Sequence, residues 1–433
     1  MELEDKLKNL TKLNLMRGRD IAPPQEKKKA VEELDGKVIS NRFGEFVLIQ
    51  KEFDSDQLHP DLAESPWINF SGKSLSKICT SRKSKSSQID PLNFDLKETI
   101  FMDCETTGLA GGAGTYAFLV GLGYLSGTKF RLEQYFMQDF HQERAVLTAV
   151  MERMSKFKFL VSFNGKCYDL PLLESRWLMN RMEFDSSSWV HFDLLFPSRR
   201  LWKRRIGDCS LGNLEQKILS VKREVDVPSF MIPQIYFDYL RTGEVEPLVP
   251  VFHHNAHDIL SLMRLSVLID RLLEDFASIG VKDPLDLYSL GRIHYHFGNY
   301  QLSERCYRQA LNEELPLDLC STVYLSLAFV YKRMELWEKA REVWHQLMEG
   351  DYPFHPRVYE ELAKYYEHRI KDCPRALLLV ENVLSLINSG LHSNVNSVNP
   401  RRSTGDDTLP SWQYRKDRLL RKIEKVQGRK NTD

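Results

Sequence analysis

The central part of the chain alternates short apolar runs with amphipathic segments. The runs of strand length are residues 99–103, 115–125, 130–137, 159–163 and 189–195. The segments with helical spacing are residues 143–154, 170–181 and 257–276. Because three strands come first and strands and helices then alternate, we predict a mixed sheet flanked by helices, forming an α/β domain over residues 96–276.

The amino-terminal part has a less regular pattern. Residues 1–35 place Leu among Lys and Glu at helical spacing, and residues 38–53 have the pattern of strands around a glycine turn. Residues 72–87 are rich in Ser and Lys, which leaves little to bury and predicts a mobile loop or linker. We therefore predict a separate amino-terminal extension over residues 1–95.

A repeated helical pattern follows Asp283. Residues 287–311 place small and aromatic side chains at tetratricopeptide spacing, residues 328–344 repeat the pattern, and a weaker third unit lies near residues 363–376. Small residues at these positions let two antiparallel helices approach closely. The pattern predicts an all-α tetratricopeptide-like repeat domain over residues 284–388, with an irregular helical bundle as the alternative.

The last segment, residues 389–433, has two parts of different composition. Residues 388–410 are rich in Ser, Asn, Gly and Pro, which predicts disorder. Residues 413–430 are strongly basic and have the pattern of a short helix. Either a solvated tail or a nucleic-acid contact explains this helix.

Composition and charge limit the classes of protein that the chain can belong to. The 433 residues are 42% hydrophobic and 28% charged, with a formal net charge of +0, which excludes collagen-like and wholly disordered classes and a chain-wide basic field. The odd number of cysteines, 7, without a CxxC pair, argues against a disulfide framework or a zinc site. Reduced thiols and the charged segment MELEDKLKNL predict a cytoplasmic location.

One uncharged stretch, Thr106 to Thr128, is long enough to span a bilayer. It contains seven glycines, among them Gly111, Gly112 and Gly114, and directly follows Asp103 and Glu105. A strand, a tight loop and a second strand explain this composition better than a membrane helix. We therefore expect no membrane contact.

Four acids stand where strands end or helices begin. Asp103 and Glu105 follow an apolar run, and residues i and i+2 of a strand point to the same face. Asp169 follows the run 159–163 at the start of a helix, and Asp258 lies at the start of the helix predicted at 257–276. Taken singly, each fits an ordinary solvated strand-end acid or a helix-start charge that interacts with the dipole.

The order of these acids and the segments around them point to a known family. FMDCETTGLAGGAGTYAFLVG, SFNGKCYDLPLL, FDLLFPSRRLW with CSLGNLE, and HNAHDILSL resemble the YprB-type ribonuclease-H-like family of the DEDD exonuclease superfamily. The resemblance covers about residues 96–270. It implies an α/β ribonuclease-H-like fold, a mixed sheet flanked by helices, followed by an all-α tetratricopeptide-like repeat domain.

The resemblance also implies a catalytic site. Asp103, Glu105, Asp169 and Asp258 would be the ligands of two divalent ions, Mg²⁺ or Mn²⁺, because these hard cations prefer carboxylate oxygens. A nearby histidine would be the general base for the attacking water. If the helix already includes residue 254, His254 and Asp258 form an i, i+4 pair on one face. We therefore predict His254 as the base and His253 as the alternative.

Other residues near these motifs are candidates for nucleic-acid binding. The loop after Glu105 offers Gly111, Gly112 and Gly114, whose backbone N–H groups suit a phosphate, although a tight strand connection explains the glycines as well. The loop before Asp169 adds Asn164 and Lys166. The basic run supplies the remaining candidates, Arg199, Arg200, Trp202, Lys203, Arg204 and Arg205. Its cations suit phosphates and its indole suits stacking on a base, with a solvated basic face as the alternative.

Two residues inside these motifs are expected to be structural. Asp193 has no spacing that makes it a ligand, so we predict hydrogen bonding, and Cys104 is predicted to fill space.

The sequence as a whole predicts a metal-dependent nuclease. We expect a 3′ to 5′ exonuclease on single-stranded DNA or RNA, with repeats that bind a protein partner. The alternatives are a nucleic-acid-binding scaffold without turnover and a tetratricopeptide adaptor.

Overall fold

The computed structural model describes most of the chain. The described residues are 34–54, 70–80, 89–108, 114–185, 188–223, 226–389 and 409–430. The helices predicted in 1–35, Gly111, Gly112 and most of the segment predicted to be disordered lie outside these ranges. The chain divides into two compact units, Met1–Gly280 and Val281–Asp433, each described below by itself.

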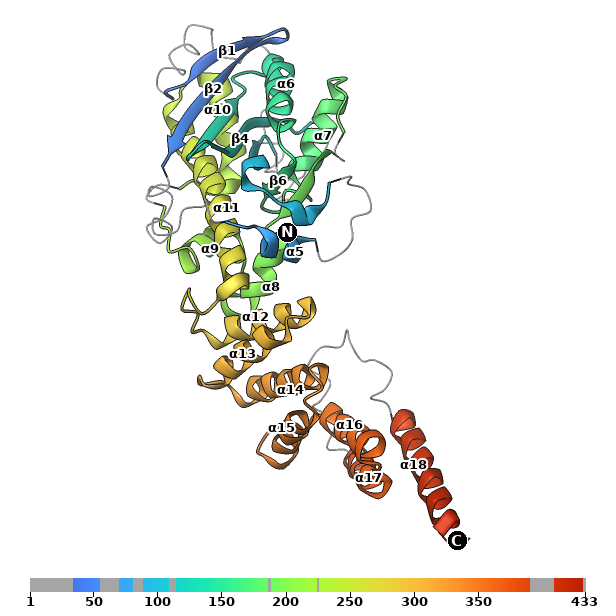
Figure 1. Cartoon of the computed structure of the whole chain (residues 1–433). Helices are drawn as coiled ribbons and strands as arrows, with labels where there is room; N and C mark the ends of the chain where they lie inside the picture. The colour runs from blue at the N-terminus through green and yellow to red at the C-terminus, as the bar shows by residue number, and fades with distance from the viewer. Residues whose placement is uncertain are drawn as a thin grey trace, which may run out of the picture. The chain divides into compact units, whose positions relative to one another are not determined.

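The first unit is built on one mixed sheet of seven strands (Figure 1). The strands are β1 (Lys37–Asn41), β2 (Gly44–Phe53), β3 (Thr99–Thr106), β4 (Ala117–Ser126), β5 (Lys129–Phe136), β6 (Phe159–Ser162) and β7 (Val190–Asp193), in the spatial order β1-β2-β5-β4-β3-β6-β7. The pairs from β1 to β3 are antiparallel, whereas β3, β6 and β7 are parallel. The predicted mixed sheet is therefore confirmed.

The predicted boundary near residue 95 does not separate the first two strands from this sheet. β2 pairs with β5 over seven residues on each strand, from Val47↔Phe136 to Phe53↔Phe130. Phe46, Val47 and Ile49 are buried in the same core as the later strands. The β1–β2 hairpin is thus an extension of the sheet rather than a separate part of the chain.

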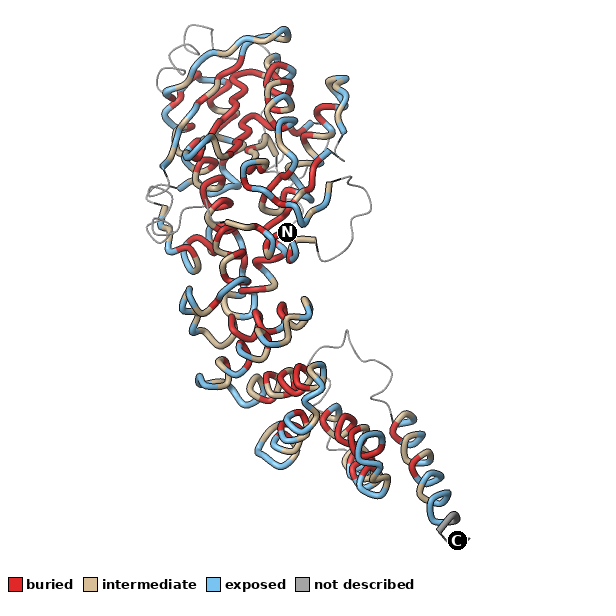
Figure 2. The backbone as a smooth tube through the Cα atoms, in the orientation of Figure 1, coloured by how far each residue is buried: buried red, intermediate tan, exposed pale blue. Residues whose placement is uncertain are grey.

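Seven α-helices of this unit lie in the described ranges. They are α5 (Lys73–Cys79), α6 (Glu143–Met154), α7 (Asp169–Met179), α8 (Leu195–Ile206), α9 (Leu211–Lys217), α10 (Ile232–Thr242) and α11 (Val249–Asp275). Short 3-10 turns lie at Pro91–Asn93, Leu96–Glu98, Phe140–Gln142, Ser229–Met231 and Glu246–Leu248. α11 packs on β3, β4 and β5, and α6 packs on β1, β2 and β5. Figure 2 shows the buried residues gathered in the strands and on the sides of helices that pack against them.

Part of the Ser- and Lys-rich segment is ordered, which corrects the prediction of a mobile linker over 72–87. α5 buries Leu75 and Ile78 and packs on α11. The carboxylate of Asp270 accepts hydrogen bonds from the backbone N–H of Gly72 at 3.0 Å and of Leu75 at 2.8 Å. Asp270, on a helix far away in the sequence, thus accepts hydrogen bonds from the otherwise unpaired N–H groups at the start of α5. Local composition does not reveal this contact.

The helix predicted at 257–276 begins eight residues earlier, at Val249. Pro250 lies in its first turn, where a missing N–H costs no hydrogen bond. Val251 and Phe252 are buried, so the additional turns pack on the sheet. Residues 253 and 254 are consequently both helical.

The second unit is entirely helical in its described residues. Its helices are α12 (Pro284–Phe297), α13 (Tyr300–Leu311), α14 (Leu317–Arg333), α15 (Trp337–Glu349), α16 (Pro356–Tyr365), α17 (Cys373–Asn388) and α18 (Leu409–Lys430), with a π-helical turn at Tyr366–Ile370. A Cβ on Gly291 would lie 2.4 Å from the ring of Tyr307, so only glycine lets α12 and α13 approach this closely. This fits the predicted role of small residues, while the tetratricopeptide assignment itself stays a prediction.

The basic carboxy-terminal helix packs on the helical unit, which corrects the prediction of a solvated tail. α18 packs on α17 and buries Trp412 and Leu419. Its cations pair with acids of the preceding helices: Arg415 with Glu360 at 3.0 Å, Lys416 with Glu381 at 2.8 Å, and Arg418 and Lys422 with Glu367 at 2.6 and 2.7 Å. These charges are therefore largely neutralised within the protein.

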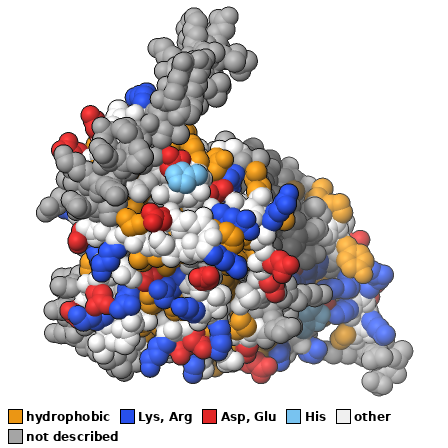
Figure 3. Space-filling view, turned by 90° about the horizontal axis from the view of Figure 1, so that it is seen from above, with side chains coloured by type: hydrophobic (Ala, Val, Ile, Leu, Met, Phe, Trp, Pro, Cys, Tyr) orange, Lys and Arg blue, Asp and Glu red, His pale blue; other side chains and the backbone are white. Residues whose placement is uncertain are grey.

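Figure 3 shows Lys and Arg side chains intermixed with Asp and Glu on the face it presents. Over the ranges that the structure describes, no helix combines the length and the apolar character needed to cross a bilayer. The stretch Thr106–Thr128 that raised this question contains all of β4 and the last residue of β3.

Candidate active site

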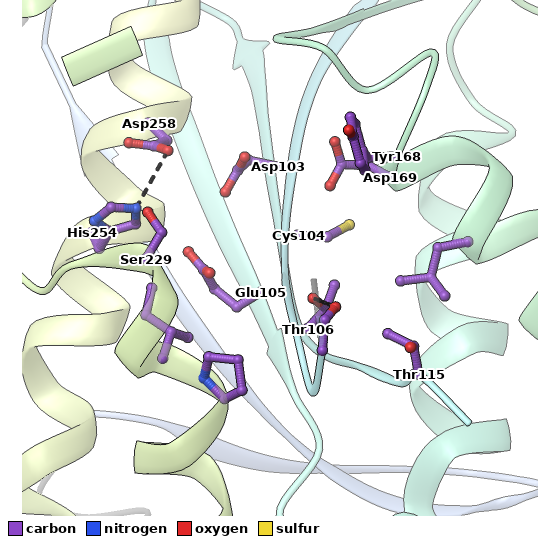
Figure 4. Close-up of a pocket in the computed structure, with 14 residues that line it drawn as sticks. Asp103, Cys104, Glu105, Thr106, Thr115, Tyr168, Asp169, Ser229, His254 and Asp258 are labelled. Carbon is purple, nitrogen blue, oxygen red and sulfur yellow. Dashed lines mark hydrogen bonds and ion pairs between the residues drawn. The ribbon is translucent and has the colours of Figure 1, made fainter. Parts of the chain in front are cut away.

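A pocket of about 420 Å³ lies among β3, α7 and α11 (Figure 4). The candidate residues in its lining are Asp103, Glu105, Asp169, His254 and Asp258. In Figure 4, Asp103 and Glu105 on β3 lie between the histidine and aspartate of α11 and the start of α7. The structure therefore brings the four predicted acids and the predicted base to one site, while their roles stay predictions.

Asp169 lies beyond the point where the parallel strands β3 and β6 stop pairing. The pairing of β3 with β6 ends at Phe101↔Val161, before the acids of β3 are reached. Asp169 opens α7 beyond this point, and backbone N–H groups of Asp169 and Cys104 hydrogen-bond to its carboxylate. Asp169 is therefore held beside Asp103 and Glu105 at the end of β3.

A buried amide relay holds Asp103 in place. Asn255 is fully buried, and its Nδ2 donates to Asp103 Oδ2 at 2.9 Å and to the Asp103 carbonyl at 3.2 Å. Gln134 Nε2 in turn donates to Asn255 Oδ1 at 3.0 Å. Gly121, the cross-strand partner of Asp103, leaves room for this amide, since a Cβ there would lie 2.2 Å from Asn255 Oδ1.

We expect Gly121→Ala to destabilise the fold by about 1–3 kcal/mol, because the new methyl group overpacks the amide relay. Urea unfolding monitored by circular dichroism measures this change. Gly212→Ala is the matched control, because a Cβ added there, on the exposed side of α9, would meet no atom within 4 Å. Equal stability of the Gly121→Ala variant and the wild-type protein would show that Asn255 is not held as described.

Burial and mutual repulsion keep the acids from being charged together. Burial raises the pKa of Asp103 well above its usual value, and the charges of Asp258, Glu105 and Asp169 raise it further. Burial likewise raises the pKa of Glu105 to about 8 and that of Asp169 to about 7. The pKa of Asp258 is also raised by burial, although His254 and Arg223 oppose the change. The pocket therefore contains too little positive charge to compensate four ionised carboxylates.

The donor set fits divalent cations in kind. Across the described ranges, no three His, Cys, Asp or Glu side chains already have the spacing of a metal site. The pocket nevertheless collects four carboxylates, which are the hard oxygen donors that Mg²⁺ and Mn²⁺ prefer. A cation among them would also stabilise the ionised carboxylates and so lower their pKa values.

This electrostatic penalty predicts a pH-dependent stabilisation by metal. In the unfolded chain the acids titrate near pH 4, whereas in the folded chain Asp169 and Glu105 titrate at about 7 and about 8. Between about pH 4 and about pH 8 the folded state therefore binds more protons than the unfolded chain. The stability of the metal-free protein consequently falls as pH rises through this window. We expect Mg²⁺ to raise the melting temperature more at the upper end of the window than at its lower end. Differential scanning calorimetry with NaCl of equal ionic strength as the control measures this difference, and an equal shift at both ends would contradict it.

His254 is oriented by an acid outside the predicted set. Its Nδ1 lies 2.7 Å from Asp226 Oδ1, and its Nε2 lies 3.7 Å from Asp258 Oδ2. Burial by itself would lower the pKa of His254, but the charges of Asp258 and Glu105 and the hydrogen bond with Asp226 raise it on balance. The Nε2 atom is thus the one that faces the acids.

Arg223 links this histidine to the last acid of the set. Its guanidinium forms a bidentate pair with Glu215 at 2.7 and 2.8 Å, and it also donates to Asp258. The same group lies 3.0 Å from His254 Nδ1. Sequence reasoning missed Arg223, Glu215 and Asp226. Arg223 and Asp226 lie outside every periodic segment or motif used, Glu215 ends the motif CSLGNLE without being singled out, and the three meet only in the folded chain.

The other two histidines lie elsewhere on α11. His253 is exposed and does not line the pocket, because it is one residue away from the face that carries His254 and Asp258. His257 is half-buried, with a buried Nδ1 that lacks a hydrogen-bond partner among the described residues. The condition for preferring His254, a helix that includes residue 254, is therefore met.

The loop before Asp169 is fixed by Asp193, as predicted for that residue. Asp193 accepts hydrogen bonds from the backbone N–H of Asn164 at 2.7 Å, of Lys166 at 3.2 Å and of Leu195 at 3.1 Å. Asn164 has a φ of 63°, a left-handed conformation that Asn tolerates better than most residues. Lys166 is exposed, so its predicted contact with nucleic acid remains sterically open.

The basic run forms most of α8, and its tryptophan is not available for stacking. Trp202 is only 2% exposed, because it shares the inward stripe of the helix with Leu195, Ser198 and Leu201. This corrects the prediction that its indole stacks on a base. The Arg and Lys residues of α8 lie off the buried stripe and do not line the pocket. Their binding to nucleic acid stays a prediction, as does that of the exposed Gly114.

Comparison with known proteins finds a match within the first unit. Residues 100–269, from β3 to α11, match the family model of the RNase_H superfamily. The α/β domain is thus similar to proteins of the ribonuclease H superfamily. This similarity favours a nuclease-type hydrolase, a class that generally uses divalent metals and acts on nucleic acid.

A curated relative extends the match beyond the ribonuclease H-like domain. The chain is 28% identical over 322 residues to the uncharacterized protein YprB of Bacillus subtilis (strain 168), covering 73% of this chain and 76% of the relative. Among solved structures, the family B DNA polymerase of Pyrobaculum calidifontis matches with 13% identity and a TM-score of 0.32, over 55% of this chain and 29% of the polymerase. A likeness this low supports no conclusion about function.

Proposed function

We propose that this protein is a metal-dependent 3′ to 5′ exonuclease acting on single-stranded DNA or RNA. The observation that carries the proposal is the convergence of four carboxylates and one histidine in the pocket of a ribonuclease H-like domain. The raised pKa values of the acids support a cation-binding role, because four carboxylates without cations are costly to ionise together.

The four acids and the histidine of the pocket each have a role in this proposal. Asp103, Glu105, Asp169 and Asp258 hold two Mg²⁺ or Mn²⁺ ions, which when bound supply charge stabilisation for the attacking and leaving oxygens. His254 Nε2 accepts the proton of the attacking water. Asp226 holds the opposite ring nitrogen, which fixes the orientation of the imidazole.

Arg223 limits the repulsion at one side of the pocket. Its pair with Asp258 leaves that carboxylate less dependent on a cation than Asp103, which has no ion pair with Lys or Arg among the described residues. Arg223 thereby keeps Asp258 oriented toward the pocket before metal binds, and the pair with Glu215 keeps Arg223 itself in place.

Cleavage of labelled oligonucleotides tests the proposed function. A 5′-labelled single strand incubated with Mg²⁺ should give a ladder that shortens by single nucleotides, and a blocked 3′ end should stop it. Parallel DNA and RNA strands identify the preferred substrate. Binding without any cleavage, in Mg²⁺ and in Mn²⁺ alike, would instead favour a scaffold without turnover.

A further inference from the structure

A second concave site lies within the helical unit. A groove of about 670 Å³ is lined by residues of α12, α13, α14, α15 and α16. Four of its lining residues are Arg or Lys, namely Arg292, Lys332, Arg333 and Arg357, and none of the described lining residues is Asp or Glu. Because the chain as a whole is neutral, this local excess of positive charge points to an anionic ligand.

The arginines of this groove rest on aromatic rings rather than on acids. Arg292 lies over the ring of Tyr288 at 5.8 Å, and Arg357 lies over that of Phe329 at 5.7 Å. Arg333 Nε donates to the hydroxyl of Tyr295 at 3.3 Å. All three arginines are exposed, and a guanidinium stacked on a ring keeps its N–H edge available to a ligand. Lys332, in contrast, is paired with Glu361.

Half-exposed aromatic rings line the same groove as these cations. Tyr295, Phe329 and Trp337 line the same groove and are neither buried nor fully exposed. Arg369 lies 4.2 Å from the ring centre of Trp337. A groove that combines aromatic rings with guanidinium groups has the composition of surfaces that stack bases and bind the backbone of a single strand.

We propose that this groove binds a stretch of single-stranded nucleic acid, with Arg292, Arg333 and Arg357 on its phosphates and Tyr295 or Trp337 stacked on its bases. An acidic peptide fits less well. Arg and Lys side chains only donate hydrogen bonds, which suits phosphate oxygens, whereas a peptide main chain also presents N–H groups that need acceptors. The groove goes beyond the proposed cleavage chemistry, because strand binding here requires neither metal nor turnover.

Binding measured without cleavage tests the groove separately from the nuclease. Fluorescence anisotropy of a labelled oligothymidylate is followed over a salt series in chelator, with the full-length Asp103→Asn chain as the parent. We expect Arg333→Ala with Arg357→Ala to reduce the slope of log affinity against log salt by about 1.4, since each phosphate contact of a single strand contributes about 0.7. Affinity at low salt should fall at least about tenfold.

Arg308→Ala with Arg341→Ala is the matched control. Both residues are on the surface of the same unit, do not line the groove, and pair with acids of their own helix. This control should keep the affinity and the salt slope of the parent. Equal slopes for the two double variants would overturn the proposal, whether or not the protein proves to be a nuclease.

Tryptophan fluorescence gives a second, local measurement. Oligothymidylate should quench the emission of the parent protein and should quench a Trp337→Phe variant less, because the stacked indole is the one removed. Polyglutamate of similar charge should compete weakly. Saturable polyglutamate binding that Arg333→Ala with Arg357→Ala abolishes, together with unchanged oligothymidylate binding, would show a peptide site instead.

Discussion

Replacing Asp103 by Asn should abolish cleavage while leaving the fold and strand binding intact. The amide has the shape of the carboxylate and still offers an oxygen to Asn255 Nδ2, so the relay from Gln134 survives. It lacks the charge that a divalent cation requires. Because burial and three neighbouring acids raise the pKa of Asp103, the metal-free fold loses no favourable charge when the amide replaces it.

Two measurements check this expectation together. Release of nucleotides from a labelled strand in Mg²⁺ gives the activity, and calorimetric melting in chelator gives the stability. Asp238→Asn is the matched control, since Asp238 is a half-exposed acid of α10 that pairs with Arg241 and does not line the pocket. Retained Mg²⁺-dependent cleavage in the Asp103→Asn variant would refute the assignment of the pocket.

Replacing His254 by Ala should lower the cleavage rate by about 10²- to 10⁴-fold, the usual cost of losing a general base. The replacement leaves the four carboxylates in place, so binding of Mn²⁺ should persist. His253→Ala should stay within about tenfold of the wild-type rate, because His253 is exposed and outside the pocket. Single-turnover kinetics for both variants and Mn²⁺ titration calorimetry measure these effects. The reverse ranking of the two histidines would assign the base to His253.

The sequence predicted the helices and strands better than the contacts between segments that are far apart in the chain. The strands from 99 to 195 and the helices at 143–154 and 170–181 follow from hydrophobic spacing, which is a local property. The pairing of β2 with β5 and the contact of α5 with Asp270 depend on residues far apart in the chain. Local composition therefore suggested a separate extension and a linker where the fold has sheet and helix.

The candidate site shows the same division. The four acids and His254 were predicted from strand and helix positions and from motif resemblance, and the pocket contains all of them. Trp202 was misjudged, because a basic run suggests exposure while the helical phase of α8 turns this residue inward. Asn255, Arg223 and Asp226 act through tertiary contacts that no spacing along the chain encodes.

The basic tail illustrates why charge alone does not indicate a ligand. α18 is rich in Lys and Arg, but Glu360, Glu367 and Glu381 form ion pairs with four of them. In the groove of the helical unit, the exposed arginines lie against rings instead. The difference lies in the packing partners, which only the structure provides.

Anomalous diffraction from crystals soaked in Mn²⁺ tests the central claim most directly. The account predicts two peaks about 3.5–4 Å apart in the pocket, contacted by the carboxylates of Asp103, Glu105, Asp169 and Asp258, and their loss in crystals of the Asp103→Asn variant. Crystals that show no Mn²⁺ in this pocket, grown from protein that cleaves single strands in Mn²⁺, would contradict it.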